Sequence, residues 1–426
     1  MAPYFQILYL PQRNSLNISL LSFRTFLRII HVKTKIISRT IWILSFVSLF
    51  TDMASEMLYP IMPLYLQQIG FTIIGIGILE GVAEAIAGLS KGYFGKWSDS
   101  IGKRLPFVQL GYTLSALSKP MMALFTYPWW IFTSRSLDRI GKGIRTGARD
   151  ALLSDEATPQ TKGRVFGFHR SMDTLGAAIG PALALLFLYY NPGQYKTLFL
   201  IAFIPGLFAI TASLLLKEKK RLPTSDFKPQ SFLAFIHYWK ISNPAYKKLV
   251  TSLLIFALVN SSDVFLLLQM KSSGISDTTL IGIYIFYNLV YALAAYPIGI
   301  VADKLGLKKM FVSGLLLFVV VYAGMAFVES LAGFIILFFI YGLYAAATEG
   351  IAKAWISNIV SKGETATAIG TYSGFQSLAA LLASSLAGLI WFNFGASVLF
   401  TTAAAITLLV IIYITFKIQK PGYVES

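Results

Sequence analysis

The chain contains no cysteine and only three histidines, His31, His169 and His237, among 426 residues. The missing cysteine excludes disulfides, thiolate metal sites and cysteine nucleophiles. No two histidines have the spacing of metal ligands, and no Ser/His/Asp set can be assembled from them. We therefore expect no enzyme, no metal and no cofactor.

Charge is also scarce. Only 13% of the residues are charged, whereas a soluble domain carries roughly a quarter. Hydrophobic residues make up 56% of the chain, and the mean hydropathy is +0.67. Apolar runs of about twenty residues can cross a hydrocarbon core about 30 Å thick as helices. The alternation typical of a membrane β-barrel is missing. The sequence predicts an all-α membrane protein with twelve transmembrane helices, at 40–66, 72–94, 106–126, 129–150, 163–188, 196–216, 247–270, 279–301, 310–328, 331–353, 365–390 and 395–416.

The spans fall into two pseudo-symmetric six-helix bundles, predicted at 39–216 and 247–418. Between them, 217–246 is polar and proline-containing, as a cytoplasmic linker would be. Its SFLAFIHYW stretch reads either as plain linker or as a short interfacial helix. The basic tail at 1–38 is either an amphipathic helix on a membrane surface or disordered, and 419–426 is a C-terminal tail.

The net charge of +17 follows the membrane topology. With both termini in the cytoplasm, most Lys and Arg lie on the cytoplasmic side, and only Lys196 and Lys271 fall on the other. The opposite orientation would invert this bias. We therefore expect a multi-pass protein of a bacterial-type inner (plasma) membrane. Its partners would be the lipid bilayer, protons and a small-molecule substrate, with no nucleic acid, and it would be a monomer.

One short charged turn occurs twice. GKWSDSIGKR at 95–104 and GIVADKLGLKK at 299–309 both read G-x-x-x-D-x-x-G followed by a basic pair. Each turn follows one apolar run and precedes another. A charged turn at matching places in two hydrophobic halves indicates a duplicated helical bundle, a plan that recurs in transporters with the binding region between the halves.

With these turns the chain resembles the major facilitator superfamily over about 40–416. Gly167, Gly176, Gly180 and Pro181 give G-x8-G-x3-G-P, which is similar to the antiporter motif of its proton-coupled drug exporters. The trailing glycine pair of that motif is replaced here by Ala184-Leu185. Pro60-Ile61-Met62-Pro63 resembles the P-x-x-P of the twelve-helix drug:proton antiporter branch.

The resemblance implies that Asp99 helps to latch the cytoplasmic ends of the two halves together. A solvated turn that only sets topology is the alternative. The corresponding gating candidates are Asp99, Gly95, Gly102, Arg104, Arg145, Arg149, Asp303 and Gly306. Small residues allow close helix approach, and a Gly-Pro step permits bending, which makes Gly176, Gly180 and Pro181 the helix-bending candidates.

Ionisable residues at bilayer depth cost at least ~2.5–3.5 kcal/mol each, so they usually pair or line a water-filled cavity. Asp52 and Glu56 lie one helical turn apart in the first span, and RSLDRIGKGIRTGARD forms a charged stripe in the fourth. A carboxylate beside such a stripe can alternately bind and release a proton. The coupling candidates are Asp52, Glu56, Glu84, Asp263 and Glu349. The substrate-binding candidates are Arg139, Lys142, Arg135, Asp138, Asn260, Tyr287, Asn288, Tyr344 and Gln376. Structural ion pairing and aromatic packing remain alternative roles for them.

Together these features predict a secondary active transporter that works by alternating access. The leading hypothesis is proton-coupled efflux of a small amphipathic or anionic compound, such as a drug, siderophore or metabolite. A proton-coupled importer or facilitator of an organic anion is the first alternative. A transport-inactive membrane sensor is the second.

Overall fold

The computed structural model describes residues 36–59, 61–218 and 234–418. The described residues of the body that begins at Arg39 are almost entirely helical, and no strand occurs among them. The predicted tails at 1–38 and 419–426 lie almost wholly outside the described residues, as does Pro60 of the P-x-x-P motif. The helices are α2 (Arg39–Glu56), α3 (Met62–Gln68), α4 (Ile73–Ile101), α5 (Leu105–Leu124), α6 (Pro128–Asp155), α7 (Lys162–Tyr190), α8 (Tyr195–Ser213), α9 (Ala234–Ile241), α10 (Pro244–Ala257), α11 (Val264–Ser272), α12 (Asp277–Leu305), α13 (Leu307–Met325), α14 (Leu331–Asn358), α15 (Thr365–Phe394) and α16 (Ala396–Lys417).

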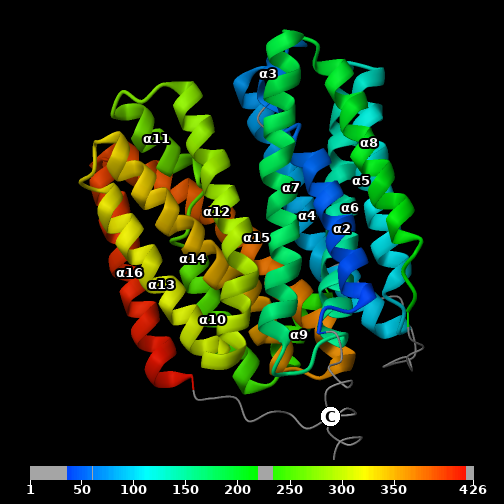
Figure 1. Ribbon diagram of the computed structural model, residues 1–426, viewed down its shortest axis with the longest axis vertical. Helices are drawn as coiled ribbons and strands as arrows, with labels where there is room; N and C mark the ends of the chain where they lie inside the picture. Colours follow the sequence, from blue (N-terminus) through cyan, green and yellow to red (C-terminus); the bar gives the residue numbers. More distant parts are fainter. Residues whose placement is uncertain (1–35, 60, 219–233, 419–426) are drawn as a thin grey trace, which may run out of the picture. The chain divides into compact units, whose positions relative to one another are not determined.

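If α2 with α3 and α10 with α11 each count as one span, the described helices other than α9 form twelve spans, six on each side of α9. Seven of them, α7, α8 and α12 to α16, are long and apolar enough to cross a membrane by length and composition alone. In Figure 1 the blue-to-green helices of the first half stand beside the yellow-to-red helices of the second, with α7 and α12 between them. The predicted all-α architecture of two bundles is confirmed.

The first and seventh spans are each interrupted, whereas the sequence predicted continuous helices at 40–66 and 247–270. α2 ends at Glu56, and α3 begins at Met62 with a proline in its first turn, where a missing N–H is tolerated. The second break holds Asn260-Ser261-Ser262-Asp263, whose short polar side chains compete with helical hydrogen bonds. Both breaks bring an acidic residue, Glu56 or Asp263, to a helix end.

Two pairs of helices make most of the contacts between the halves, α4 with α15 and α7 with α12. Their contacts concentrate at the end of the bundle where α9 lies, which we call the linker end (Figure 1). Glycine makes the approach possible: a Cβ on Gly95 would meet the carbonyl oxygen of Ala366 at 2.5 Å, and one on Gly167 would meet that of Ala295 at 2.5 Å. The backbones of the two halves therefore touch at the linker end.

The three helix-bending candidates lie in α7, which continues through Pro181. A Cβ on Gly180 would meet the carbonyl oxygen of Met53 at 2.5 Å, and a Cβ on Gly176 would come still closer to the carbonyl oxygen of Leu49. These glycines thus allow α7 to pack against α2.

Candidate functional site

The two repeated aspartates join the halves in the same way. Asp99, near the end of α4, accepts hydrogen bonds from the backbone N of Thr367 (2.7 Å) and its Oγ1 (2.8 Å), in the first turn of α15. Asp303, near the end of α12, accepts from the backbone N of Gly163 (2.7 Å) and of Arg164 (3.1 Å), in the first turn of α7. Each carboxylate therefore satisfies free N–H groups at the positive end of a helix in the opposite half.

Basic side chains complete both junctions. Arg104, which is 2% exposed, pairs with Asp99 (3.0 Å) and Asp155 and donates to the carbonyl of Lys362 across the interface (2.8 Å). Arg164 Nε donates to Asp303 (2.9 Å). Of the other gating candidates, Gly102 ends α4 in a left-handed conformation and Gly306 lies between α12 and α13, both with positive φ.

The linker itself contacts the Asp99 junction at two places. Glu218 accepts hydrogen bonds from the backbone N of Arg104 (2.8 Å) and Leu105 (2.9 Å) at the start of α5. In α9, Tyr238 donates to the Glu364 carboxylate (3.4 Å), and burial together with that carboxylate raises the pKa of Tyr238 above its usual range. The predicted linker thus contains a short helix that packs on α15 and α4.

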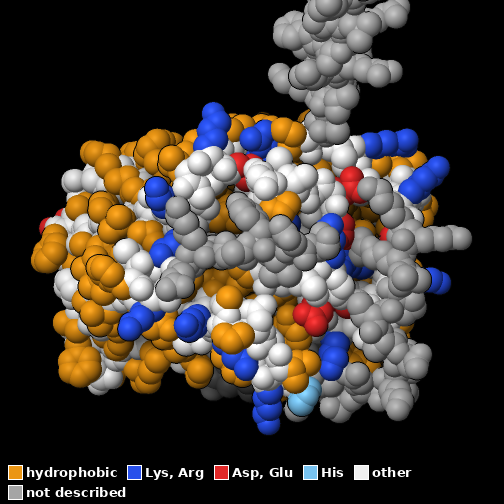
Figure 2. All heavy atoms as spheres, turned by 90° about the horizontal axis from the view of Figure 1, so that it is seen from below, with side chains coloured by type: hydrophobic (Ala, Val, Ile, Leu, Met, Phe, Trp, Pro, Cys, Tyr) orange, Lys and Arg blue, Asp and Glu red, His pale blue; other side chains and the backbone are white. Residues whose placement is uncertain are grey.

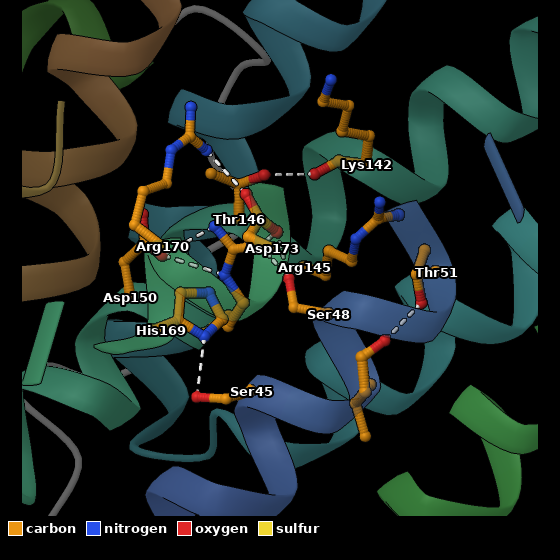
Figure 3. Close-up of polar contacts among 12 residues, drawn as sticks. Ser45, Ser48, Thr51, Lys142, Arg145, Thr146, Asp150, His169, Arg170 and Asp173 are labelled. Atoms are coloured by element: carbon orange, nitrogen blue, oxygen red, sulfur yellow. Dashed lines mark hydrogen bonds and ion pairs between the residues drawn. The ribbon is translucent and has the colours of Figure 1, made fainter. Parts of the chain in front are cut away.

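Above the junctions lies a layer of ion pairs, shown in part in Figure 3. Arg170 of α7 donates to Asp173 (2.6 Å), to Glu349 of α14 and to Tyr291 of α12 (2.6 Å). Ser48 of α2 donates to the same Asp173. This set connects the two halves at the depth of the predicted coupling residues.

A second connection in this layer joins Asp150 of α6 to Lys353 of α14 (2.7 Å) and to Arg149 (2.9 Å). His169 of α7 lies beside Ser45 (3.4 Å), with its Nε2 unpaired among the described residues (Figure 3). Buried charges in this layer are therefore largely compensated by partners from neighbouring helices.

A polar cavity of about 230 Å³ opens over this layer. Six basic and three acidic side chains line it, together with Asn260, Tyr344 and Gln376 among the predicted substrate residues. Arg149, Arg170 and Lys353 are ion-paired as described above. Lys91, Lys142 and Arg145 have no carboxylate within 4.0 Å among the described residues.

Two of these three cations contact neutral side chains instead. Lys91 donates to Ser377 Oγ (2.9 Å), and Arg145 donates to Ser115 Oγ (2.6 Å) and lies over the Tyr112 ring (4.8 Å). The Lys142 side chain extends away from the Arg170–Asp173 pair in Figure 3, with no dashed line at its ammonium group. We call Lys91, Lys142 and Arg145 the cation cluster.

A larger and mainly apolar cavity of about 730 Å³ adjoins the first, and Lys142 lines both. Its walls come from α2, α4, α6, α7, α11 and α12. It contains Arg139, opposite Glu84 at 3.6 Å, and the two acidic residues at the helix breaks, Glu56 and Asp263. Tyr341 donates to Asp263 at 2.6 Å. All five predicted coupling residues therefore line one or the other cavity.

Several predicted substrate residues line neither cavity. Arg135 binds Glu80 through Nε (2.7 Å) and Nη2 (2.8 Å), and Asp138 pairs with Lys119 (2.6 Å). Tyr287 and Asn288 are buried, with Tyr287 among the rings of α12 and α14 and Asn288 bonded to the Tyr284 carbonyl (3.0 Å). Arg135 and Asp138, both predicted to bind substrate, are thus held in ion pairs with Glu80 and Lys119 within the first half.

Lys91, Arg170, Asp173 and Lys353 line the polar cavity but were not among the predicted site residues. One signal for Lys91 was available in the sequence. Glu84 and Lys91 are seven residues apart, which places them on one face of α4.

Lys119→Met should destabilise the folded protein by about 3–5 kcal/mol, because the buried Asp138 carboxylate loses its 2.6 Å partner and keeps only the longer contact with Arg135, at 3.5 Å, among ion pairs within 4.0 Å in the described residues. Thermal unfolding in detergent measures the loss. The double variant Lys119→Met/Asp138→Leu removes both charges and should recover most of it. If the double variant is as unstable as Lys119→Met alone, the unpaired Asp138 carboxylate is not what destabilises the protein.

Comparison with known proteins places these features in context. The family model described as Major Facilitator Superfamily matches residues 44–285 and 249–425. An uncharacterized MFS-type transporter of Methanocaldococcus jannaschii is 34% identical over 361 residues, covering 83% of this chain and 89% of the relative. A multi-drug resistance efflux pump homolog of Lactococcus lactis is 23% identical, covering 86% and 92%. The crystal structure of the human organic anion transporter MFSD10 has the same fold, with a TM-score of 0.73 at 17% identity and coverage of 88% and 99%.

Proposed function

Because the chain belongs to the Major Facilitator Superfamily, it is a membrane transporter and not an enzyme, and we propose that it carries a small organic anion by proton-coupled alternating access. The cation cluster is the observation that carries this proposal. Three basic side chains without a carboxylate partner are expensive at bilayer depth, and an anionic substrate would compensate them. Asn260, Tyr344 and Gln376, on the wall of the same cavity, would contribute hydrogen bonds.

We propose that the linker end faces the cytoplasm. Figure 2, which views that end, shows many Lys and Arg side chains and few acidic ones, as the positive-inside rule requires. Exposed examples are Lys103, Lys217, Lys240, Lys309 and Lys362. Since the two halves touch at this end, the structure would represent an outward-facing state in the plasma membrane, with the Asp99 and Asp303 junctions holding the cytoplasmic side closed.

We assign proton coupling first to Asp52, which shares the polar cavity with Lys142 and Arg145. A proton on Asp52 removes a negative charge beside the cation cluster and so changes its affinity for an anion. Opening and closing of the junctions would change which side of the membrane can supply that proton. Protonation of Glu349, which pairs with Arg170, would in the same way weaken an ion pair that joins the two halves.

Export is supported by the antiporter-like motif and by the efflux pump relative. Inward cotransport is a second candidate, and one specific observation favours it. Neutralising Asp52 makes the cavity more positive, so proton and anion binding reinforce each other electrostatically. Exchange would require the proton and the anion to exclude each other, for example by occupying the same space.

Transport into inside-out vesicles with an imposed pH gradient tests these alternatives, using a labelled carboxylate, sulfonate and phosphate monoester. Exchange predicts that an acid interior drives anion accumulation. Cotransport predicts that an acid interior drives anion release. Asp52→Asn should abolish the gradient dependence in either case. Transport that is indifferent to the gradient would overturn proton coupling, and binding of none of the three anions would overturn the anion proposal.

A further inference from the structure

The two cavities differ sharply in character although they meet at Lys142. The polar cavity, of about 230 Å³, has room only for a compact group, and charged side chains dominate its lining. The adjoining cavity, of about 730 Å³, is walled by Leu185, Leu267, Leu268, Leu280 and Ile281. Its volume lies in the range of pockets that hold drug-sized ligands. A small inorganic anion would leave this apolar wall unused.

The charge of the polar cavity points to a head group with more than one negative charge. Six basic side chains face three acidic ones, and two of the acidic ones, Asp173 and Glu349, already bind Arg170. The cation cluster is left over, and Nε of Arg145 has no hydrogen-bond partner among the described residues. A doubly charged head compensates such a cluster better than a singly charged one.

The apolar walls extend from the cation cluster toward the end of the bundle opposite the linker end. α7 and α12 touch at Gly167 and Ala295, and toward their other ends they contribute Leu185, Leu280 and Ile281 to the apolar cavity. A molecule with its head at Lys142 would therefore place a chain or ring system between these walls. Each methylene group buried there should tighten binding about three- to fourfold.

Resting on the anion transport proposed above, we propose that the substrate is an amphiphile with a divalent anionic head, such as a phosphate monoester, and one apolar chain. The head binds Lys91, Lys142 and Arg145. The chain lies in the apolar cavity against Leu267 and Leu280. This arrangement assigns head recognition to α4 and α6 of the first half and chain recognition mainly to α11 and α12 of the second.

Binding of methyl, hexyl and decyl phosphate to the full chain in lipid nanodiscs tests the proposal, with decyl sulfate and decanol for comparison. Hexyl phosphate should bind at least thirtyfold tighter than methyl phosphate. Decyl phosphate, doubly charged at pH 8, should bind at least tenfold tighter than decyl sulfate. Decanol should not compete.

Chain partitioning into lipid is controlled with a matched pair of variants. Leu267→Trp fills the apolar cavity and should lower the decyl-to-methyl affinity ratio at least tenfold. Leu293→Trp, on α12 but 67% exposed and outside both cavities, should leave the ratio as in the wild type. Retained methyl phosphate binding shows that each variant is folded.

The outcomes separate the two proposals. If methyl phosphate binds but the chain-length ratio is the same in the wild type, Leu267→Trp and Leu293→Trp, the chain does not occupy the apolar cavity, and the anion proposal stands. If decyl sulfate binds as tightly as decyl phosphate, the divalent head is wrong. If no phosphate of any length binds the wild-type protein, the proposed substrate is wrong, and the anion proposal fails with it only if the labelled carboxylate and sulfonate do not bind either.

Discussion

Lys142→Gln should lower the initial rate of hexyl phosphate transport about a hundredfold. Lys142 lines both cavities and has no carboxylate within 4.0 Å among the described residues, so its loss removes a positive charge that the substrate head would contact directly. Truncating one member of a buried charge pair typically costs 2–5 kcal/mol, and a hundredfold lies within that range. Uptake by proteoliposomes at saturating and at limiting concentration measures the effect.

Two control variants make this prediction specific. Lys142→Arg keeps the charge and should retain more transport than Lys142→Gln. Lys309→Gln removes an exposed charge on α13, far from both cavities, and should transport at the wild-type rate. A Lys142→Gln protein that transports within threefold of the wild type would remove the cation cluster from the substrate site.

Gly95→Val should shift the protein away from the closed linker end. The added Cβ would meet the Ala366 carbonyl oxygen at 2.5 Å and its carbon at 3.1 Å, and because both are backbone atoms no side chain can move aside. Overpacking of this kind costs about 1–3 kcal/mol, which corresponds to a shift of roughly five- to 150-fold in the conformational equilibrium.

The cysteine-free sequence gives a direct readout of that shift. A single Ala302→Cys reporter lies in the other junction, between α12 and α7, and is fully buried while the linker end is closed. Its labelling by a soluble maleimide should accelerate at least fivefold in Gly95→Val. Gly81→Val is the matched control on the same helix, because a Cβ added at Gly81 meets nothing within 4 Å. Equal labelling rates in the two variants would mean that α4 and α15 do not govern the closure.

The sequence predicted the fold and the closed junctions more fully than the polar site. The repeated turns identified both aspartates, because symmetry and hydropathy are properties of the chain alone. The breaks at Glu56 and Asp263 were missed because hydropathy averaged over a span does not change when the helix is interrupted. Pro60 and Pro63 were present in the sequence but do not by themselves give the position of a break.

The charged stripe of α6 shows why the site was harder to predict. Arg135, Arg139 and Lys142 follow one helical rhythm, and nothing local distinguishes them. The position of α4 distinguishes them, because it brings Glu80 within 2.7 Å of Arg135 and places no carboxylate within 4.0 Å of Lys142 among the described residues. Which cation binds substrate and which stabilises the bundle depends on contacts between helices, and helical spacing does not specify them.

With the proposed alternating access, the cation cluster would also make the empty transporter responsive to membrane voltage. When the cavity changes the side on which it is accessible, its net positive charge crosses the electric field, at about 2.3 kcal/mol per elementary charge per 100 mV. An inside-negative membrane would therefore hold the empty site toward the cytoplasm, and a bound divalent anion, which offsets two of the three charges of the cation cluster, would weaken this response to voltage. Transient currents in the absence of anion, reduced in Lys142→Gln, would report this movement. The resting potential would thus determine the side of the membrane from which the empty site is accessible.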